Sequence, residues 1–363
     1  MLIARAPVRI SLAGGGTDLP AYYEKYGGCV VSTTINKYFY TFLNVNEDQE
    51  IQITSSDYRT FYRHDGNGPP LWEGDLSLPR AILHHFGICR GVSMFLASEV
   101  PPGTGLGSSS TVAVAVIKAV ATACGLHLSR QEIAELACHI EIEKLGMPIG
   151  KQDQYAAAFG GLNFISFTRD GVTVESLRIT PQTRRDLEQH LLLFYTGAAR
   201  DSASILGEQK KASARDDPKV IAALHAVKEM AYQVKACLER GEVRRIGELL
   251  HQNWEQKKRF ASGVTNPLID ECYELARANG AVGGKITGAG GGGFLMLYCE
   301  PEHQDAVTQA LEARGLKRMD FRFDYQGARI LMNAALRLPD GRGRRADSVL
   351  RFPSSVLRLP FRQ

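Results

Sequence analysis

The sequence has little net charge, no cysteines paired as CxxC and no long apolar run. Its 363 residues carry a formal net charge of only +4, and part of that excess lies in "DGRGRRADSVLRF" near the C-terminus. A nearly neutral body gives no electrostatic reason to expect a nucleic-acid partner. A membrane-spanning helix needs about 20 consecutive apolar residues, and no segment approaches that length. The N-terminal "MLIARAPVRIS" also lacks the long apolar stretch of a signal peptide.

The seven cysteines are scattered singly, and most of them lie within apolar patterns. Zinc sites need clustered ligands, so this pattern predicts buried thiols in a reducing compartment. With 44% apolar and 23% charged residues, the composition is typical of a soluble, cytoplasmic enzyme that acts on small molecules. Neither a nucleic acid nor a membrane is expected as a partner. The oligomeric state stays open between monomer and homodimer.

Hydrophobic patterns predict an α+β protein. Roughly the first hundred residues alternate β-rich runs with turns, which is typical of strands. A helix is expected after Ser129, where Glu132 completes a capping box, and Gly146 and Pro148 end it. Further helices are expected between Ser202 and Asn279.

The same patterns divide the chain into two mixed halves and a tail. Residues 1–185 are expected to form an N-terminal domain and residues 186–333 a C-terminal domain. Residues 334–363 are rich in arginine and proline and have weak periodicity. This tail is expected to be disordered or loosely packed.

The segment "PPGTGLGSSS" joins a glycine-rich loop to a long apolar helix. Glycines allow the backbone to approach a ligand closely, and the helix start offers free N–H groups and a positive dipole end. The segment therefore predicts a phosphate-binding loop, although an ordinary helix start with a flexible lead-in is the alternative. The expected cofactor-binding residues are Pro102, Gly103, Gly105, Leu106, Gly107, Ser108, Ser109 and Ser110.

Two familiar phosphate loops are excluded. A Walker loop needs a lysine, and this loop has none. A Rossmann loop needs GxGxxG early in a βαβ unit, whereas the spacing here is GxGxG.

Two further glycine clusters are candidates for substrate binding. In "ISLAGGGTDLP", an aspartate on a glycine-shaped loop is suited to sugar hydroxyls, although a capped turn is the alternative. In "GAGGGGFLMLYC", the glycines lead into a strand and are expected near a ligand or another backbone, with a loose hairpin as the alternative. The expected substrate-binding residues are Gly15, Gly16, Thr17 and Asp18 from the first cluster, and Gly288, Gly290 and Gly291 from the second.

The segment "HIEIEKLGMPIGKQDQYAAAFGG" places acids around a Gly/Pro turn. Glu141 and Glu143 precede the turn, and Lys151 and Asp153 follow it. Two acids near a phosphate loop suit a magnesium ligand and a base for a hydroxyl group. Helical periodicity does not choose between Glu141 and Glu143, and a solvated helix face is the alternative for each acid.

These segments occur in the order "APVRISLAGGGTD", "PPGTGLGSSS", "GMPIGKQDQ" and "TGAGGGG", and together they resemble the GHMP kinases. This family includes galactokinase, homoserine kinase, mevalonate kinase and phosphomevalonate kinase, and the resemblance covers roughly residues 1–333. It implies an N-terminal domain like ribosomal protein S5 domain 2 and a C-terminal ferredoxin-like α/β domain. The active site would lie between them and would use ATP and Mg²⁺.

The resemblance also implies roles for individual residues. The aspartate of "GKQDQ", Asp153, would activate the acceptor hydroxyl, with Arg9 of "APVR" or Lys151 beside it. The first acid of "EIE", Glu141, is favoured as the magnesium ligand, together with Ser109 of the loop.

The sugar loop narrows the expected substrate. Galactokinases carry "GEHTD" where this chain has "GGGTD", and the segments are most similar to the branch that phosphorylates C1 of D-glycero-D-manno-heptose 7-phosphate for surface glycans. L-fucose kinases come next, and a non-catalytic sugar and ATP sensor is a further alternative, although both active-site acids favour catalysis. A heptose 7-phosphate needs a cation at its far end. The candidates are Lys25, Arg80, Lys151 and Arg200, the last being an expected substrate-binding residue.

Overall fold

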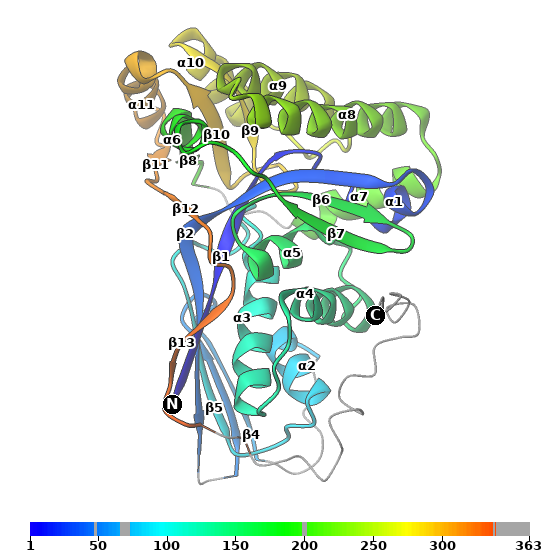
Figure 1. The fold of residues 1–363 in the computed structure, drawn as a ribbon, viewed down its shortest axis with the longest axis vertical. Coiled ribbons are helices and arrows are strands. Elements are labelled where there is room, and N and C mark those ends of the chain that lie inside the picture. Colours follow the sequence, from blue (N-terminus) through cyan, green and yellow to red (C-terminus); the bar gives the residue numbers. More distant parts are fainter. Residues whose placement is uncertain (47–48, 66–72, 198–201, 337, 339–363) are drawn as a thin grey trace.

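The computed structural model describes residues 1–46, 49–65, 73–197, 202–336 and 338. In this part of the chain, two β-sheets lie one above the other along the long axis of the molecule, each with its own helices (Figure 1). The larger sheet has nine strands and the smaller has four. None of the described helices is both long and apolar enough to cross a bilayer.

The large sheet is organised around one 18-residue strand, β2, which is hydrogen-bonded to β1, β5, β6 and β12. Its length comes from the β-branched and aromatic run "CVVSTTINKYFYTFLNV". The strands of this sheet are β1 (Leu2–Ala13), β2 (Gly28–Val45), β3 (Ile51–Ser55), β4 (Thr60–His64), β5 (Val92–Ser98), β6 (Leu162–Thr168), β7 (Gly171–Ser176), β12 (Phe323–Asp324) and β13 (Arg329–Asn333).

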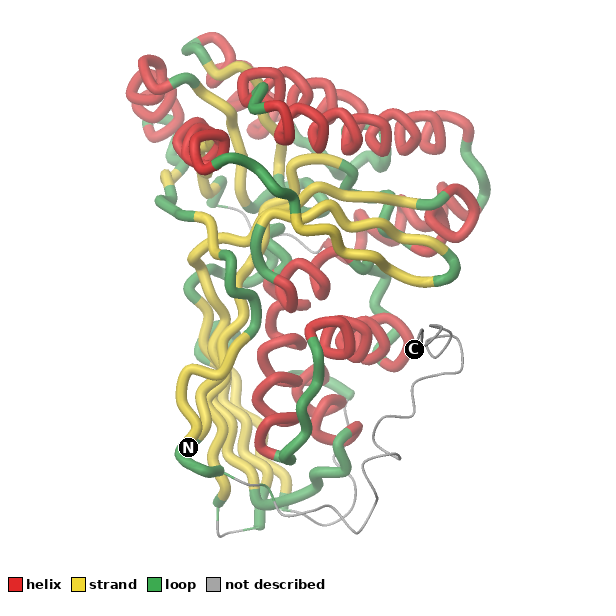
Figure 2. Tube along the Cα trace, in the orientation of Figure 1, coloured by secondary structure: helices red, strands yellow, loops and turns green. Residues whose placement is uncertain are grey.

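Helices cover one face of the lower part of this sheet, and none of the described helices lies on the other face of that part (Figure 2). The buried alanine and valine residues of α3 pack there against β1 and β2 in one hydrophobic core. Ser129 and Glu132 form the expected capping box at the start of α4. The helices of this half are α1 (Pro20–Tyr26), α2 (Ser77–His85), α3 (Ser108–Ala123), α4 (Arg130–Cys138), the π-helix η1 (His139–Lys144) and α5 (Gln152–Phe159).

The small sheet has the connectivity that the resemblance implied. Its strands follow a βαββαβ path and lie in the order β11-β8-β10-β9, which is the ferredoxin-like arrangement. The strands are β8 (Leu191–Tyr195), β9 (Ala281–Ile286), β10 (Phe294–Cys299) and β11 (Lys317–Arg318). The helices are α6 (Pro181–His190), α7 (Ser202–Ala214), α8 (Pro218–Arg240), α9 (Val243–Lys257), α10 (Pro267–Ala278), the 3-10 helix η2 (Pro301–His303) and α11 (Gln304–Glu312).

Two strands near the end of the predicted C-terminal domain lie in the other half. β12 pairs with β2, and β13 pairs with β1 along the edge of the large sheet. The chain therefore returns to the N-terminal half after β11. The predicted division into residues 1–185 and 186–333 does not include this return. The domain boundary at residue 185 stays a prediction.

The predicted tail is described only at residues 334–336 and 338. Leu338 is buried, and its N–H donates to the carbonyl of Ala123 at the end of α3 over 3.0 Å. This residue is packed on the N-terminal core. The rest of the disorder prediction lies outside the described residues.

Candidate active site

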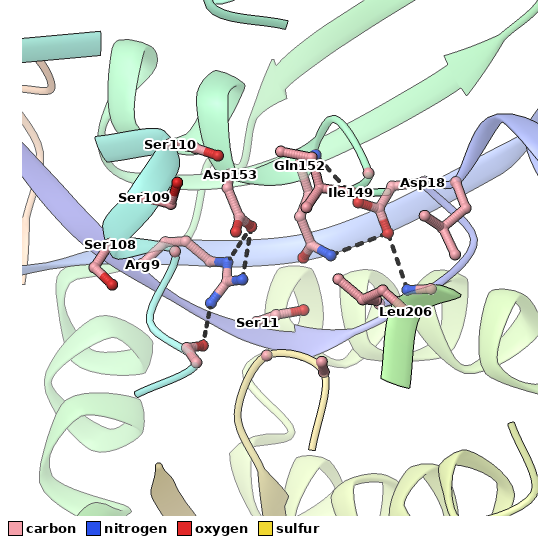
Figure 3. A pocket seen from close by; sticks show the side chains of 18 of the residues that line it. Arg9, Ser11, Asp18, Ser108, Ser109, Ser110, Ile149, Gln152, Asp153 and Leu206 are labelled. Carbon is pink, nitrogen blue, oxygen red and sulfur yellow. Dashed lines mark hydrogen bonds and ion pairs between the residues drawn. The ribbon is translucent and has the colours of Figure 1, made fainter. Parts of the chain in front are cut away.

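A cavity of about 230 Å³ lies where the two halves meet. Its walls come from β1, from the glycine loops that follow β1 and precede α3, and from the start of α5. The C-terminal half contributes α7, the end of α9, β9 and the 288–289 turn. Figure 3 shows Arg9 and Asp153 between the serines at the start of α3 on one side and Asp18 with Gln152 on the other. All three glycine clusters found in the sequence therefore contribute to one site.

The start of α3 is built to receive an anion. Its cap residue, Gly107, has φ +75° and has no side chain to accept hydrogen bonds from the first turn. Ser108, Ser109 and Ser110 follow it and line the cavity. The unpaired N–H groups and the positive dipole end of this 16-residue helix therefore face the cavity together with three hydroxyl-bearing residues.

The loop before α3 is in van der Waals contact with the third glycine cluster. Gly105 has φ +77°, and a Cβ atom there would lie 2.5 Å from the carbonyl oxygen of Thr287. A Cβ atom on Gly288 would lie equally close, 2.5 Å, to the Cα of Gly105. Glycine is required at both positions because two backbones meet there without space for a side chain. This contact joins the phosphate-binding loop to the C-terminal half.

Glu141 reaches the start of α3 because the helix that carries it changes its winding. Residues His139–Lys144 form a π-helix, a feature often found at functional sites. Glu141 is fully buried there and accepts from Ser109 Oγ at 3.2 Å and from Gln154 Nε2 at 2.7 Å. Glu143 is exposed and pairs with His139. The structure thus separates two acids that the sequence pattern left equivalent.

Burial raises the pKa of Glu141 to about 7, although hydrogen bonds from Gln154 and the serines lower it. A buried carboxylate whose negative charge is only partly balanced by hydrogen bonds favours a cation in contact with it. Glu141 and Ser109 supply oxygen atoms next to an anion-binding helix start, which is the donor set that Mg²⁺ prefers beside phosphates. These two residues therefore fit a magnesium site.

Asp153 and Arg9 form a close ion pair in the middle of the cavity. Arg9 Nε donates to Asp153 Oδ1 over 2.7 Å, and Arg9 Nη2 lies 2.6 Å from the same oxygen. Arg9 Nη1 donates to the carbonyl of Gly105 over 2.7 Å, which fixes the guanidinium against the phosphate-binding loop. The Arg9 side chain is only 4% exposed, whereas that of Asp153 is 24% exposed. The carboxylate is therefore held on one side and remains accessible to a ligand on the other.

Asp18 and Gln152 form a polar corner on the far side of Asp153. Asp18 Oδ1 accepts from the Gly16 N–H at 2.9 Å and from Gln152 Nε2 at 3.0 Å, and Oδ2 accepts from the Gln152 N–H at 3.2 Å. Burial and the charge of Asp153 raise the pKa of Asp18, against these hydrogen bonds. Ser11 Oγ and Gln152 Oε1 are buried beside it without a partner among the described residues. Unsatisfied oxygens around a carboxylate suit a ligand rich in hydroxyl groups.

Comparisons with known proteins agree with this arrangement. Residues 77–161 match the GHMP kinase N-terminal domain, and residues 234–317 match the GHMP kinase C-terminal domain. The chain is 36% identical over 333 residues to D-glycero-alpha-D-manno-heptose 7-phosphate kinase of Campylobacter jejuni, with 90% of this chain and 97% of that protein covered. The chain belongs to the GHMP kinase family.

Two further relatives of this GHMP kinase are informative. This chain is 28% identical over 328 residues to L-fucokinase/L-fucose-1-P guanylyltransferase of Bacteroides fragilis, and the match covers 82% of this chain and 34% of that protein. Its fold is similar to the crystal structure of a D-glycero-D-manno-heptose 1-phosphate kinase from Bacteroides thetaiotaomicron, with a TM-score of 0.76 and 29% identity. That similarity covers 92% of this chain and 99% of the other.

Most of the site residues predicted for a GHMP kinase line the cavity. The lining includes Arg9, Asp153 and Ser109, and Glu141 lies directly behind it, bonded to Ser109. The other predicted residues on the cavity wall are Gly15, Gly16, Asp18, Gly103, Gly105, Gly107, Ser108, Ser110 and Gly288.

Several predicted residues have other places in this GHMP kinase. Thr17 Oγ1 donates to the carbonyls of Gly14 and Cys29, so this side chain holds the sugar loop together. Leu106 is fully buried in the hydrophobic core, and Pro102 is not part of the cavity wall.

Two more glycines and three cations also lie away from the cavity wall. Gly290 and Gly291 pack against the backbone of Val264.

The Lys151 ammonium lies 5.2 Å above the ring of Tyr23 and takes no part in the ion pair of Asp153. Lys25 pairs with exposed Asp216, and Arg80 lies over the ring of Tyr62. Arg200 lies outside the described residues.

Sequence reasoning missed the two lysines of the cavity, Lys257 and Lys285. Lys257, at the end of α9, donates to the carbonyls of Ile286 and Gly288 over 2.9 and 2.5 Å. Burial, with the charge of Arg9, lowers the pKa of Lys257 to about 7. Signals for both residues were present. Lys257 follows Trp254 and Leu250 on the buried face of an amphipathic helix, and Lys285 interrupts an apolar strand directly before "ITGAGGGG".

Proposed function

We propose that this chain transfers the γ-phosphoryl group of ATP to the C1 hydroxyl of D-glycero-D-manno-heptose 7-phosphate, giving the 1,7-bisphosphate. The observation that carries the reaction type is the position of Asp153. Its accessible carboxylate lies between the anion-binding start of α3 and the polar corner of Asp18 and Gln152. Two relatives, the Campylobacter jejuni kinase and the Bacteroides thetaiotaomicron structure, have a heptose phosphate in their names, which supports this acceptor.

The proposed reaction follows from these positions. The C1 oxygen forms the new bond to the γ-phosphorus, and the bond from that phosphorus to the bridging oxygen of ADP breaks. The hydroxyl proton passes to the free oxygen of Asp153 and then to solvent. Arg9 holds the carboxylate in position, and the N–H groups of α3 neutralise charge on the phosphates.

Magnesium belongs to this proposal. Ser109 and Glu141 would hold the ion, with phosphate oxygens and water as its remaining ligands. A bound Mg²⁺ would supply positive charge to the β- and γ-phosphates. We place the reaction in the cytoplasm, as the cysteine pattern predicted.

A panel of acceptors tests the proposal. ADP release is measured with heptose 7-phosphate, free heptose, L-fucose, galactose and mevalonate, with an Asp153→Asn variant as the control for background hydrolysis. The phosphorylated heptose should give the highest kcat/KM, about 30-fold or more above free heptose, because one charge-assisted contact is lost without its phosphate. A preference for L-fucose would identify a fucose kinase instead. Tight ATP and sugar binding without ADP release from any acceptor would indicate a sensor.

A further inference from the structure

Lys285 is a buried lysine that lines the cavity and has no carboxylate partner among the described residues. The residue is only 3% exposed, although it belongs to the cavity wall. Its side-chain ammonium has no hydrogen bond or ion pair with any of the residues that the structure describes, although its backbone is paired with β10. Burial lowers the pKa of Lys285 well below its ordinary value, and the nearby charges of Lys257 and Arg9 lower it further. An unpaired ammonium in such a place destabilises the free protein.

The neighbouring groups increase the positive charge instead of cancelling it. Among the described residues, the Lys257 ammonium bonds only to two carbonyl oxygens, which carry no full charge. Arg9 is neutralised by Asp153, its one ionic partner among the described residues. Among the described residues, neither lysine has a carboxylate to balance its ammonium form. A phosphate ester, with a charge of about −1.5 to −2 at pH 7, would favour that protonated form of both.

We propose that Lys285, supported by Lys257, binds a phosphate group of a bound substrate, as a second anion site of the cavity distinct from the start of α3. This inference rests on the proposed function, since it needs a substrate that brings a phosphate group to the side of the cavity formed by β9 and α9. Two groups have this chemistry. One is the γ-phosphate of the nucleotide, and the other is the 7-phosphate of the acceptor.

The test begins with a charge-removing variant, Lys285→Met, which keeps an unbranched apolar stem. Lys317→Met is the matched control, because Lys317 is an exposed lysine of the same four-stranded sheet. Dissociation constants are measured by calorimetry, without turnover, for inorganic phosphate, ATP, ADP, heptose 7-phosphate and free heptose. Lys285→Met should bind inorganic phosphate about 10- to 100-fold more weakly than wild type, as expected for loss of a charge-assisted contact. Lys285→Arg should recover part of this affinity.

The remaining ligands identify the source of the phosphate. Weaker binding of ATP but not of ADP assigns Lys285 to the γ-phosphate. Weaker binding of heptose 7-phosphate but not of free heptose assigns it to the acceptor. The inorganic phosphate arm does not depend on which sugar is the substrate, so failure of the heptose assignment leaves this site intact. Equal dissociation constants in wild type and Lys285→Met for every phosphate-bearing ligand overturn the proposal.

Stability distinguishes a ligand-binding lysine from a structural one. Without ligand, Lys285→Met should melt at or above the temperature of wild type, because the variant removes an unpaired buried charge. A lower melting temperature combined with unchanged phosphate binding would show that the ammonium serves the fold. If Lys285→Met does not fold, acetic anhydride labelling of wild type decides the question. Inorganic phosphate should protect Lys285 from acetylation, and equal labelling with and without phosphate contradicts the site.

Discussion

The contact between Gly105 and the 287–288 turn gives a sharp test of how the two halves build the site. In Gly105→Ala, the new Cβ would lie 2.5 Å from the carbonyl oxygen of Thr287. Carbon and carbonyl oxygen normally approach to about 3.3 Å, so the two backbones must separate by roughly 0.8 Å. Neither atom can rotate away, because the carbonyl belongs to the main chain and the backbone fixes the position of Cβ. Arg9 donates to the Gly105 carbonyl, so the displacement also moves the partner of Asp153.

The expected effect is a loss of about 100-fold in kcat, since a misplacement of about 1 Å in an active site costs about that much. Gly125→Ala is the matched control. Gly125 has φ +74°, close to the +77° of Gly105, but nothing lies within 4 Å of a Cβ atom at this position. Both variants share the backbone strain of about 1–2 kcal/mol for a left-handed residue with a side chain. Only Gly105→Ala also has the clash.

The assay measures kcat and KM for ATP with heptose 7-phosphate, together with the melting temperature of each variant. Gly125→Ala should lose stability while keeping a kcat close to that of wild type. Gly105→Ala should lose both. Equal kcat values in the two variants would show that the contact between the glycine loops does not position the catalytic groups, and the reasoning would be refuted.

Three further predictions concern the charged groups. Asp153→Asn should lower kcat at least 100-fold, while the ATP affinity measured by calorimetry stays nearly unchanged. If the variant keeps more than about a tenth of the wild-type kcat, the carboxylate lowers the activation free energy by only about 1.4 kcal/mol, and its proposed role is wrong. Ser109→Ala combined with Glu141→Gln should raise the free Mg²⁺ needed for half-maximal activity, and an unchanged titration would remove both residues from the metal site. Burial lowers the pKa of Lys285 on folding, so this lysine binds fewer protons in the folded state than in the unfolded state. The buried lysine therefore destabilises the folded protein fully at low pH, and this effect declines as the pH rises towards the ordinary lysine pKa. The stability gained in Lys285→Met should therefore be larger at pH 6 than at pH 10, and a gain that grows with pH would contradict the buried charge.

The sequence predicted those parts of the site that depend on local backbone geometry. A glycine loop that opens a helix can present free N–H groups to an anion, so a cavity-facing place for Ser108 to Ser110 was one of the two interpretations of "PPGTGLGSSS". The capping box at Ser129 was equally local, and it is confirmed. Asp153 and Arg9 were paired only through the family resemblance, because 144 positions separate them in the chain.

Other features depended on tertiary structure and could not be derived from local pattern. The π-helix at His139–Lys144 breaks the helical periodicity that was used to compare Glu141 with Glu143. Glycines with similar surroundings in the sequence have different uses, since Gly288 faces the cavity while Gly290 packs on Val264. The pairing of β12 and β13 with the large sheet needs contacts over most of the chain length.

The charges of the cavity are divided between the two halves. The acids Asp18 and Asp153, the Arg9 guanidinium and the nearby Glu141 come from the N-terminal half, whereas Lys257 and Lys285 come from α9 and β9. Burial raises the pKa of Asp18 and of Glu141 and lowers the pKa of both lysines, so the neutral form of each group is favoured in the free protein. Metal ions and phosphates would supply the missing partners, the cation next to Glu141 and the anion next to Lys285. Substrate binding should therefore stabilise both halves together, because each half holds charges that the bound groups neutralise.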